Sequence, residues 1–194
     1  MRNLRRAVLT LFLLLVSLAL LACGQNGPRE MAAEIPMPTE MRQATPEEAV
    51  ETYLEWLTFA YRYADSEVAT PTMTADMAQR VSYYITMNLS ADRVLNQRLD
   101  SFEIVEVENQ NEIALVKTKE AWTFNYLSPQ TGEFGDDFEV TYSVRYTVIV
   151  INGMWRVQNV AAERLSTTEP LNNTDAQDPD EALSDGADAP AIQE

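Results

Sequence analysis

The chain has 194 residues, of which 14 are Lys or Arg and 30 are Asp or Glu, so its formal net charge is −16; it contains one cysteine and no histidine. We do not expect so acidic a chain to bind nucleic acid, because that binding depends on Lys and Arg that neutralise phosphates. Without His, and with Cys23 alone, it cannot build a His-dependent triad, a His/Cys zinc site or an intrachain disulfide. No metal or cofactor is expected, and any chemistry must use Asp, Glu, Tyr, Lys or Arg.

The first 22 residues have the layout of a cleavable export signal. Three arginines precede an apolar run over residues 7–21, and this run is shorter than the roughly 20 residues that a membrane-spanning helix needs. We therefore expect residues 1–22 to be a signal peptide.

The signal ends in Leu20-Leu21-Ala22-Cys23-Gly24, which resembles the lipobox of bacterial lipoproteins. In such signals a lipid is attached to the cysteine thiol and a peptidase cuts directly before it. The resemblance implies that lipid on Cys23 holds the mature protein on the extracytoplasmic face of a cell membrane. The alternatives are an anchor helix or a signal peptide cut elsewhere. The position of the only cysteine favours the lipobox.

Composition divides the mature chain into three parts. Residues 23–44 carry Pro, Gly and charges without an apolar period, which predicts a lipidated cysteine followed by a flexible tether. Residues 164–194 are acidic, contain no basic residue after Arg164 and have few apolar side chains, which predicts a disordered tail. Residues 45–163 remain as the folded domain.

The domain begins with helical patterns. Thr45 is a suitable N-cap, Pro46 suits the first helical position, and Glu48 can complete a capping box, so a helix is predicted from here to about residue 64. A second helix is predicted over residues 75–88. We expect a short third helix after Ser90, with Val94, Leu95 and Leu99 on one face.

After Asp100 the apolar pattern alternates, which predicts strands over residues 101–108, 112–126, 138–151 and 154–162. Asn152-Gly153 is typical of a type I′ hairpin turn. Helices followed by a meander predict an α+β domain, with the N-terminal helices packed on a curved antiparallel sheet of four or more strands.

This pattern resembles the cone-shaped fold of the nuclear transport factor two-like superfamily, which includes ketosteroid isomerase and scytalone dehydratase. The segments 119–122 (KEAW), 142–148 (YSVRYTV) and 153–157 (GMWRV) look like the IMS-type domain of plastid division proteins. The superfamily contains enzymes, ligand binders and interaction modules, so the resemblance implies a fold and not a function. Its isomerase and dehydratase members use Asp, Tyr or His in the cone, and this chain has no His and no Asp at a matching strand position.

Glu120 is the unusual residue of the predicted sheet, because it shares a strand face with Trp122 and other apolar or aromatic side chains. A buried acid needs a partner, and Arg145 on the next strand is a candidate. Tyr142 and Tyr146 alternate with valines and are expected to pack in the sheet. These five residues therefore form either a buried polar network or the lining of a cavity in which Glu120 acts as a base.

Two functions remain open. The favoured one is a non-catalytic module that binds a protein or a small ligand at the cell surface, and the resemblance allows a homodimer through the sheet. The alternative is a His-free enzyme of the ketosteroid isomerase-like superfamily that uses a Glu/Tyr pair in the cavity.

Overall fold

The computed structural model describes residues 34–168. The predicted signal peptide, Cys23, the first part of the tether and nearly all of the acidic tail lie outside the described residues. Residues 34–168 belong to one compact unit, and this unit contains all of the secondary structure described below.

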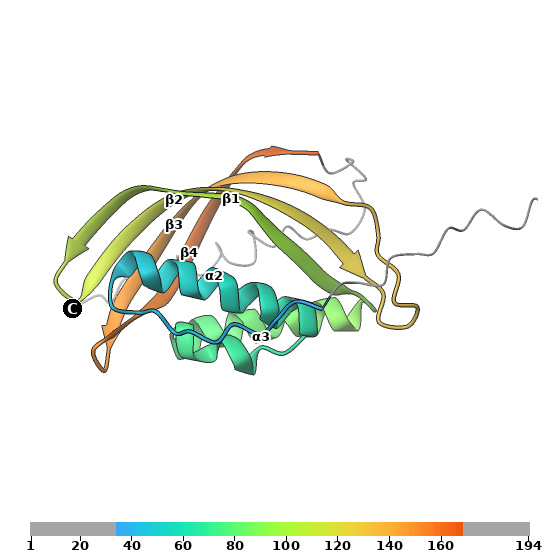
Figure 1. The fold of residues 1–194 in the computed structure, drawn as a ribbon, viewed down its shortest axis with the longest axis horizontal. Helices are drawn as coiled ribbons and strands as arrows, with labels where there is room; N and C mark the ends of the chain where they lie inside the picture. The colour runs from blue at the N-terminus through green and yellow to red at the C-terminus, as the bar shows by residue number, and fades with distance from the viewer. Residues whose placement is uncertain (1–33, 169–194) are drawn as a thin grey trace, which may run out of the picture. The chain divides into compact units, whose positions relative to one another are not determined.

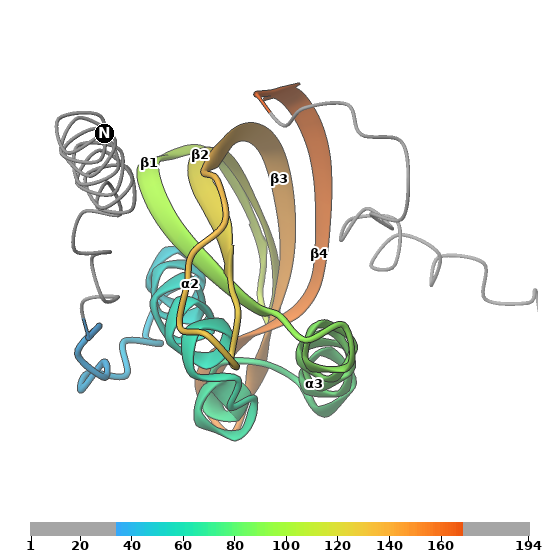
Figure 2. The ribbon, with the colours of Figure 1, turned by 90° about the vertical axis from the view of Figure 1, so that its right-hand side faces the viewer.

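A four-stranded antiparallel sheet curves over two α-helices and a short 3₁₀ helix (Figures 1 and 2). The strands follow chain order, β1-β2-β3-β4, so the sheet is a meander. The helices of residues 34–168 lie on the concave face, and none of them covers the convex face (Figure 2). The fold is thus α+β, as predicted. The bounds are α2 Pro46–Tyr63, η1 Glu67–Thr72, α3 Ala75–Ser90, β1 Val94–Gln110, β2 Ile113–Leu127, β3 Phe138–Ile151 and β4 Met154–Thr167.

Helix α2 begins where the capping signal predicts. The Thr45 hydroxyl accepts a hydrogen bond from the Glu48 amide at 3.2 Å. The Glu48 carboxylate reaches back and accepts from the Ala44 amide at 3.0 Å. The Glu48 amide in the first helical turn and the Ala44 amide just before the N-cap therefore both have partners.

The predicted third helix is wrong, because its residues form the first half of β1. Leu95 pairs with Tyr126, Gln97 with Phe124 and Leu99 with Trp122. Strand β2 is 15 residues long, and a partner strand over residues 101–108 alone would leave the backbone groups of its second half unpaired. The apolar pattern of these residues is too short to distinguish a helix from a strand. Pairing with β2 determines that they form a strand.

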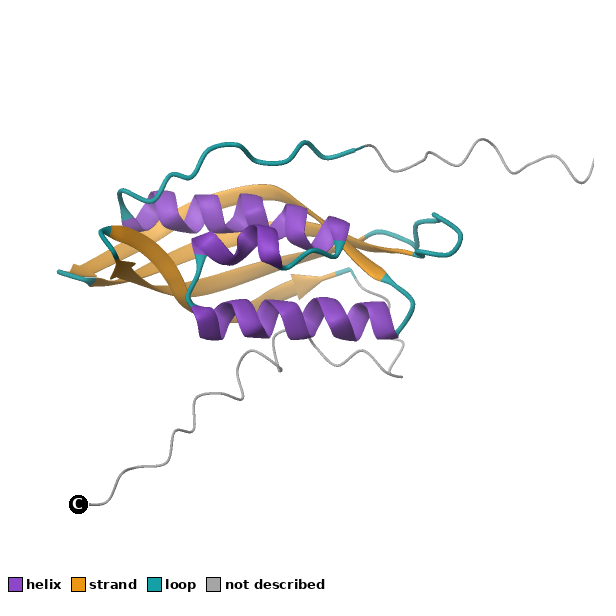
Figure 3. Ribbon diagram, turned by 90° about the horizontal axis from the view of Figure 1, so that it is seen from below, coloured by secondary structure: helices purple, strands orange, loops and turns teal. Residues whose placement is uncertain are grey.

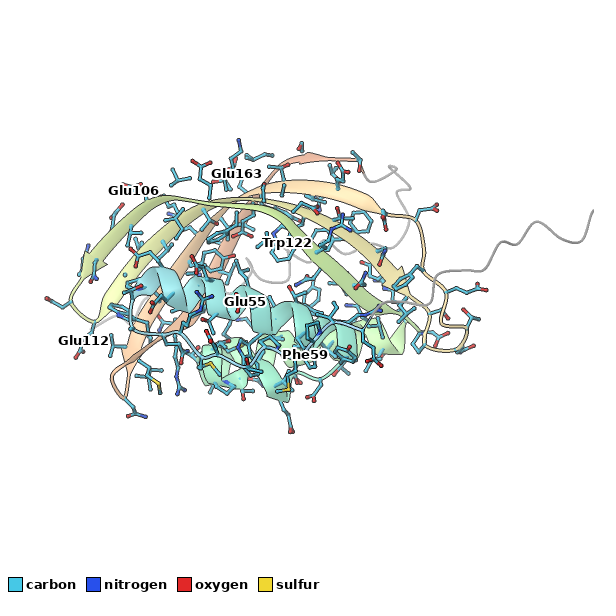
Figure 4. The ribbon with its side chains drawn as sticks, in the orientation of Figure 1. Glu55, Phe59, Glu106, Glu112, Trp122 and Glu163 are labelled. Carbon is cyan, nitrogen blue, oxygen red and sulfur yellow. The ribbon has the colours of Figure 1, made fainter. Side chains whose placement is uncertain are left out.

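Strand parity separates the two faces of the sheet. In β2 and β3 the even-numbered residues point to the concave face, where most are buried against the helices, and the odd-numbered residues point to the convex face. In Figure 4, Trp122 lies between the sheet and the helices, whereas Glu106 and Glu163 lie on the convex side. The convex face includes a surface ion pair between Lys117 and Glu106.

Residues 34–44, which we call the strap, are not a free tether, because they lie along the outer side of α2 (Figure 3). The Tyr63 hydroxyl exchanges two hydrogen bonds with the backbone of Ile35, each 3.1 Å long. The Trp56 indole donates to the Glu40 carbonyl at 3.3 Å. The compact unit accordingly begins at Glu34, ahead of the predicted domain start.

The far end of the strap is held as well. The Thr52 hydroxyl donates to the Arg42 carbonyl at 2.7 Å. The Trp155 amide of β4 donates to the Gln43 carbonyl at 3.0 Å, which ties the strap to the sheet. The strap therefore follows the whole length of α2, from its last residue back to its first turn. Within residues 34–168, no helix has the length and apolar character needed to cross a membrane.

Candidate functional site

The candidate site is the carboxylate of Glu120, which is 2% exposed and points from β2 into the concave side. Three side chains donate hydrogen bonds to it. Thr118 and Tyr146 donate to Oε1 at 2.6 and 2.7 Å, and the Trp122 indole donates to Oε2 at 2.8 Å. An ionised carboxylate can accept all three bonds, because it has acceptor sites on both oxygens and no proton of its own.

Strand geometry explains why these groups meet. Thr118, Glu120 and Trp122 are two residues apart, so they share one face of β2. Tyr146 comes from β3, where it stands opposite Val116, and its long side chain reaches the same carboxylate. The network therefore joins the two central strands on the side that faces the helices.

Arg145, the candidate partner of Glu120, is not part of this network. In the register of β2 and β3, Glu120 faces Tyr142 and Arg145 faces Lys117. Arg145 is therefore on the convex face, where its side chain is exposed. The sequence indicates that both residues lie in adjacent strands, but the strand register decides whether they share a face. Tyr142 is buried on the same face as Glu120.

Helix α2 closes the site from the other side through Tyr53, whose ring packs edge-on against Tyr146 with centroids 6.1 Å apart. Burial raises the pKa of Tyr53 well above its ordinary value, and Tyr61 and the negative charge of Glu120 raise it further. The phenol therefore stays neutral beside the carboxylate. Within residues 34–168 no basic side chain forms an ion pair with Glu120, and no cluster of acids could hold a metal ion.

Sequence reasoning missed the roles of Thr118 and Tyr53. Both carry a signal that could have been used: Thr118 is two residues from Glu120 on the same strand face, and Tyr53 lies beside the apolar stripe of its helix. The chemistry of the arrangement is that of a buried anion held by neutral donors. Each such bond to a charged group contributes about 1.5–3 kcal/mol.

The pKa of Tyr53 predicts a pH dependence of stability. Below about pH 10 the phenol is protonated in both the folded and the unfolded chain, so ionisation has no effect on stability. Above that pH the unfolded chain loses the proton and the folded chain retains it, so the free energy of unfolding falls. We expect Tyr53→Phe to reduce this alkaline loss in urea unfolding measured at about pH 9 and pH 11. Tyr83→Phe, at an exposed tyrosine of α3, should leave it unchanged, and an equal effect of the two substitutions would contradict the prediction.

Solved structures include domains that are similar to this one in fold. The intermembrane space region of the chloroplast protein ARC6 superposes with a TM-score of 0.56 at 16% identity, over 65% of this chain and 99% of that chain. An NTF2-like protein of unknown function from Shewanella oneidensis MR-1 gives a TM-score of 0.42 at 13% identity, over 61% of this chain and 98% of that one. An NTF2-like superfamily protein from Salmonella enterica gives 0.45 at 10% identity, over 66% and 95%. At 16% identity, the similarity to the ARC6 region shows the fold alone.

The sequence matches none of the curated proteins. Residues 43–152, more than half of the chain, match the family described as the TcaA protein NTF2-like domain. This match covers α2, α3 and the first three strands, including all of the Glu120 network. The chain therefore belongs to the family of TcaA NTF2-like domains.

Proposed function

We propose that this protein is a lipid-anchored protein of the cell envelope whose NTF2-like domain acts as a non-catalytic interaction module. The proposal rests on the hydrogen bonds and the burial of Glu120. Both of its oxygens already accept hydrogen bonds from the domain's own side chains, and only 2% of the residue is exposed.

A catalytic base needs a lone pair within hydrogen-bond reach of the proton that it removes. A carboxylate has about four acceptor sites, and three of those of Glu120 are taken by Thr118, Trp122 and Tyr146. Because Glu120 is 2% exposed, a substrate could reach the remaining site only if these bonds opened. Each lost bond would leave a buried donor unsatisfied. The network therefore supports a role in holding β2 and β3 together.

The alternative is a His-free enzyme, and one contact favours it. The Tyr146 hydroxyl lies 2.7 Å from Glu120, and an acid–base mechanism with a Glu/Tyr pair would need such a contact. The same tyrosine is 2% exposed and packs against Tyr53, so a substrate has no exposed member of the pair to bind. This burial makes the interaction module the better supported proposal.

The proposed anchor rests on the lipobox and is compatible with the position of the strap. If lipid is attached to Cys23, ten residues (24–33) separate it from Glu34. Fully extended, they reach about 35 Å. The domain would then work close to the membrane surface.

Substitution of Glu120 tests the structural role. We expect Glu120→Ala to lower the free energy of unfolding by about 3–5 kcal/mol, because three buried donors lose their acceptor. Tyr146→Phe removes one bond to the carboxylate and should cost about 1.5–3 kcal/mol. Urea unfolding of the mature chain, monitored by tryptophan fluorescence, measures both changes.

The matched control is Glu163→Gln, at an exposed acid of the convex face, which should change stability by less than about 0.5 kcal/mol. If Glu120 were catalytic, its replacement should not lower the free energy of unfolding. Functional groups are often held at a cost in stability, so a variant at Glu120 as stable as the wild-type protein would contradict the proposal.

Replacing the cysteine tests the anchor. We expect the wild-type protein to incorporate an alkyne fatty acid in growing cells and to partition into the detergent phase of Triton X-114. Cys23→Ser should abolish the labelling, because the chain has no other thiol. Ser17→Ala, inside the signal, should retain it. A mature protein whose mass places its first residue elsewhere than Cys23 would refute the anchor.

A further inference from the structure

The convex face of the sheet carries an apolar patch at the end where β1 turns into β2 and β3 turns into β4. We call it the turn-end patch. Its members alternate with buried residues on the strands, so they point away from the helices. The patch consists of Ile113, Leu115, Ile149, Ile151 and Met154.

The strand register makes this patch continuous. Ile113 pairs with Ile149 across β2 and β3, and Ile151 pairs with Met154 across β3 and β4. Ile113 is 52% exposed and Met154 is 40% exposed. Contiguous apolar surface of this kind marks interaction sites more often than scattered apolar residues do.

Arg156 lies in the same row, opposite Ile149 on β4. Its Nε is buried and has no hydrogen-bond partner within residues 34–168. No carboxylate of the described residues forms an ion pair with it. The domain itself covers Nε, but Arg156 as a whole is only half-buried, so a carboxylate from outside the domain could bind the accessible part of its guanidinium group.

The strap begins at the end of the domain opposite the patch. Ile35 is bound at the last residue of α2, and Gln43 is bound to Trp155, directly beside the patch. The chain towards Cys23 therefore leaves from the end of the domain opposite the patch. An 18-residue helix is about 27 Å long. In Figure 4, Glu112 marks the patch end of the domain, and α2 runs from that end towards the other.

We infer that the turn-end patch, with Arg156, is a docking surface for another envelope protein that presents an aspartate or glutamate among apolar side chains. The inference rests on the proposed anchor, which places the protein in the cell envelope. An arginine set among apolar side chains complements an acid set among apolar side chains, which is what a protein surface presents, so the occupant is a protein and not a lipid surface. Arginine beside apolar contacts is a common energetic centre of protein interfaces.

Photocrosslinking in intact cells tests this inference with the full-length protein. The photoreactive residue p-benzoylphenylalanine is placed at Ile113 or Met154 in the patch. As a control it is placed at Ser143, an exposed position in the middle of the same face, outside the patch. We expect one adduct with another protein from both patch positions and none from Ser143.

Charge reversal then identifies the contact. Arg156→Glu should lower the yield of the adduct about tenfold or more, because it places like charges together. Arg145→Glu, at an exposed arginine of the same face, should change the yield by less than about twofold. Mass spectrometry of the adduct should find an acid beside the crosslinked site of the partner. Replacement of that acid by lysine should restore the adduct of the Arg156→Glu variant.

Several results would overturn the inference: an adduct of twice the mass of this chain, an adduct with lipid, no adduct from either patch position, or an adduct that Arg156→Glu does not weaken. Fatty-acid labelling of the same cells separates the two proposals. Loss of labelling refutes the anchor, whereas a labelled protein without the adduct refutes the docking surface alone. The urea midpoint of the Arg156→Glu variant, expected to remain near that of the wild-type protein, controls for folding.

Discussion

The architecture depends on one buried negative charge. Glu120 stands in the middle of β2, on the face that packs against the helices, and a carboxylate there is costly unless its oxygens find donors. Thr118, Trp122 and Tyr146 provide them. Only the observed register of β2 and β3, with Tyr146 on the concave face, brings all of these groups together. The network therefore favours this register over a one-residue slip, which would place Tyr146 on the convex face.

A second constraint comes from the breadth of the apolar surface of α2. Val50 and Leu54 form the stripe that faces the sheet, while Trp56 and Tyr63 extend it beyond what one sheet face can cover. The strap lies along this extra surface and gives the Trp56 indole and the Tyr63 hydroxyl their partners, although Tyr63 stays 44% exposed. The same contacts set where the chain leaves the domain. The packing of α2 therefore also sets the point at which the chain leaves the domain towards the proposed lipid anchor.

The elements that the sequence predicted correctly have strong local signals. The capping residues of α2 predict a helix, and the alternating pattern of β2 and β3 predicts strands. Asn152-Gly153 predicts a type I′ hairpin turn. Residues 94–99 and the strap were not predictable in this way. In both, pairing with a distant segment determines the conformation, and local propensity is weak. Glu120 could be recognised as an acid on an apolar face, but Arg145 could not be excluded as its partner without the register.

The central claim is that the Glu120 carboxylate is permanently occupied by the domain's own donors. Hydrogen exchange of the tryptophan indole protons, followed by NMR, measures this directly, with Trp56 as the internal comparison. Our account predicts that the Trp122 indole proton exchanges only through global unfolding, because its acceptor is the buried carboxylate. The Trp56 proton, bound to the strap, should exchange faster. A Trp122 proton that exchanges as fast as that of Trp56 would mean that the site opens to solvent in the folded protein, and would contradict the account.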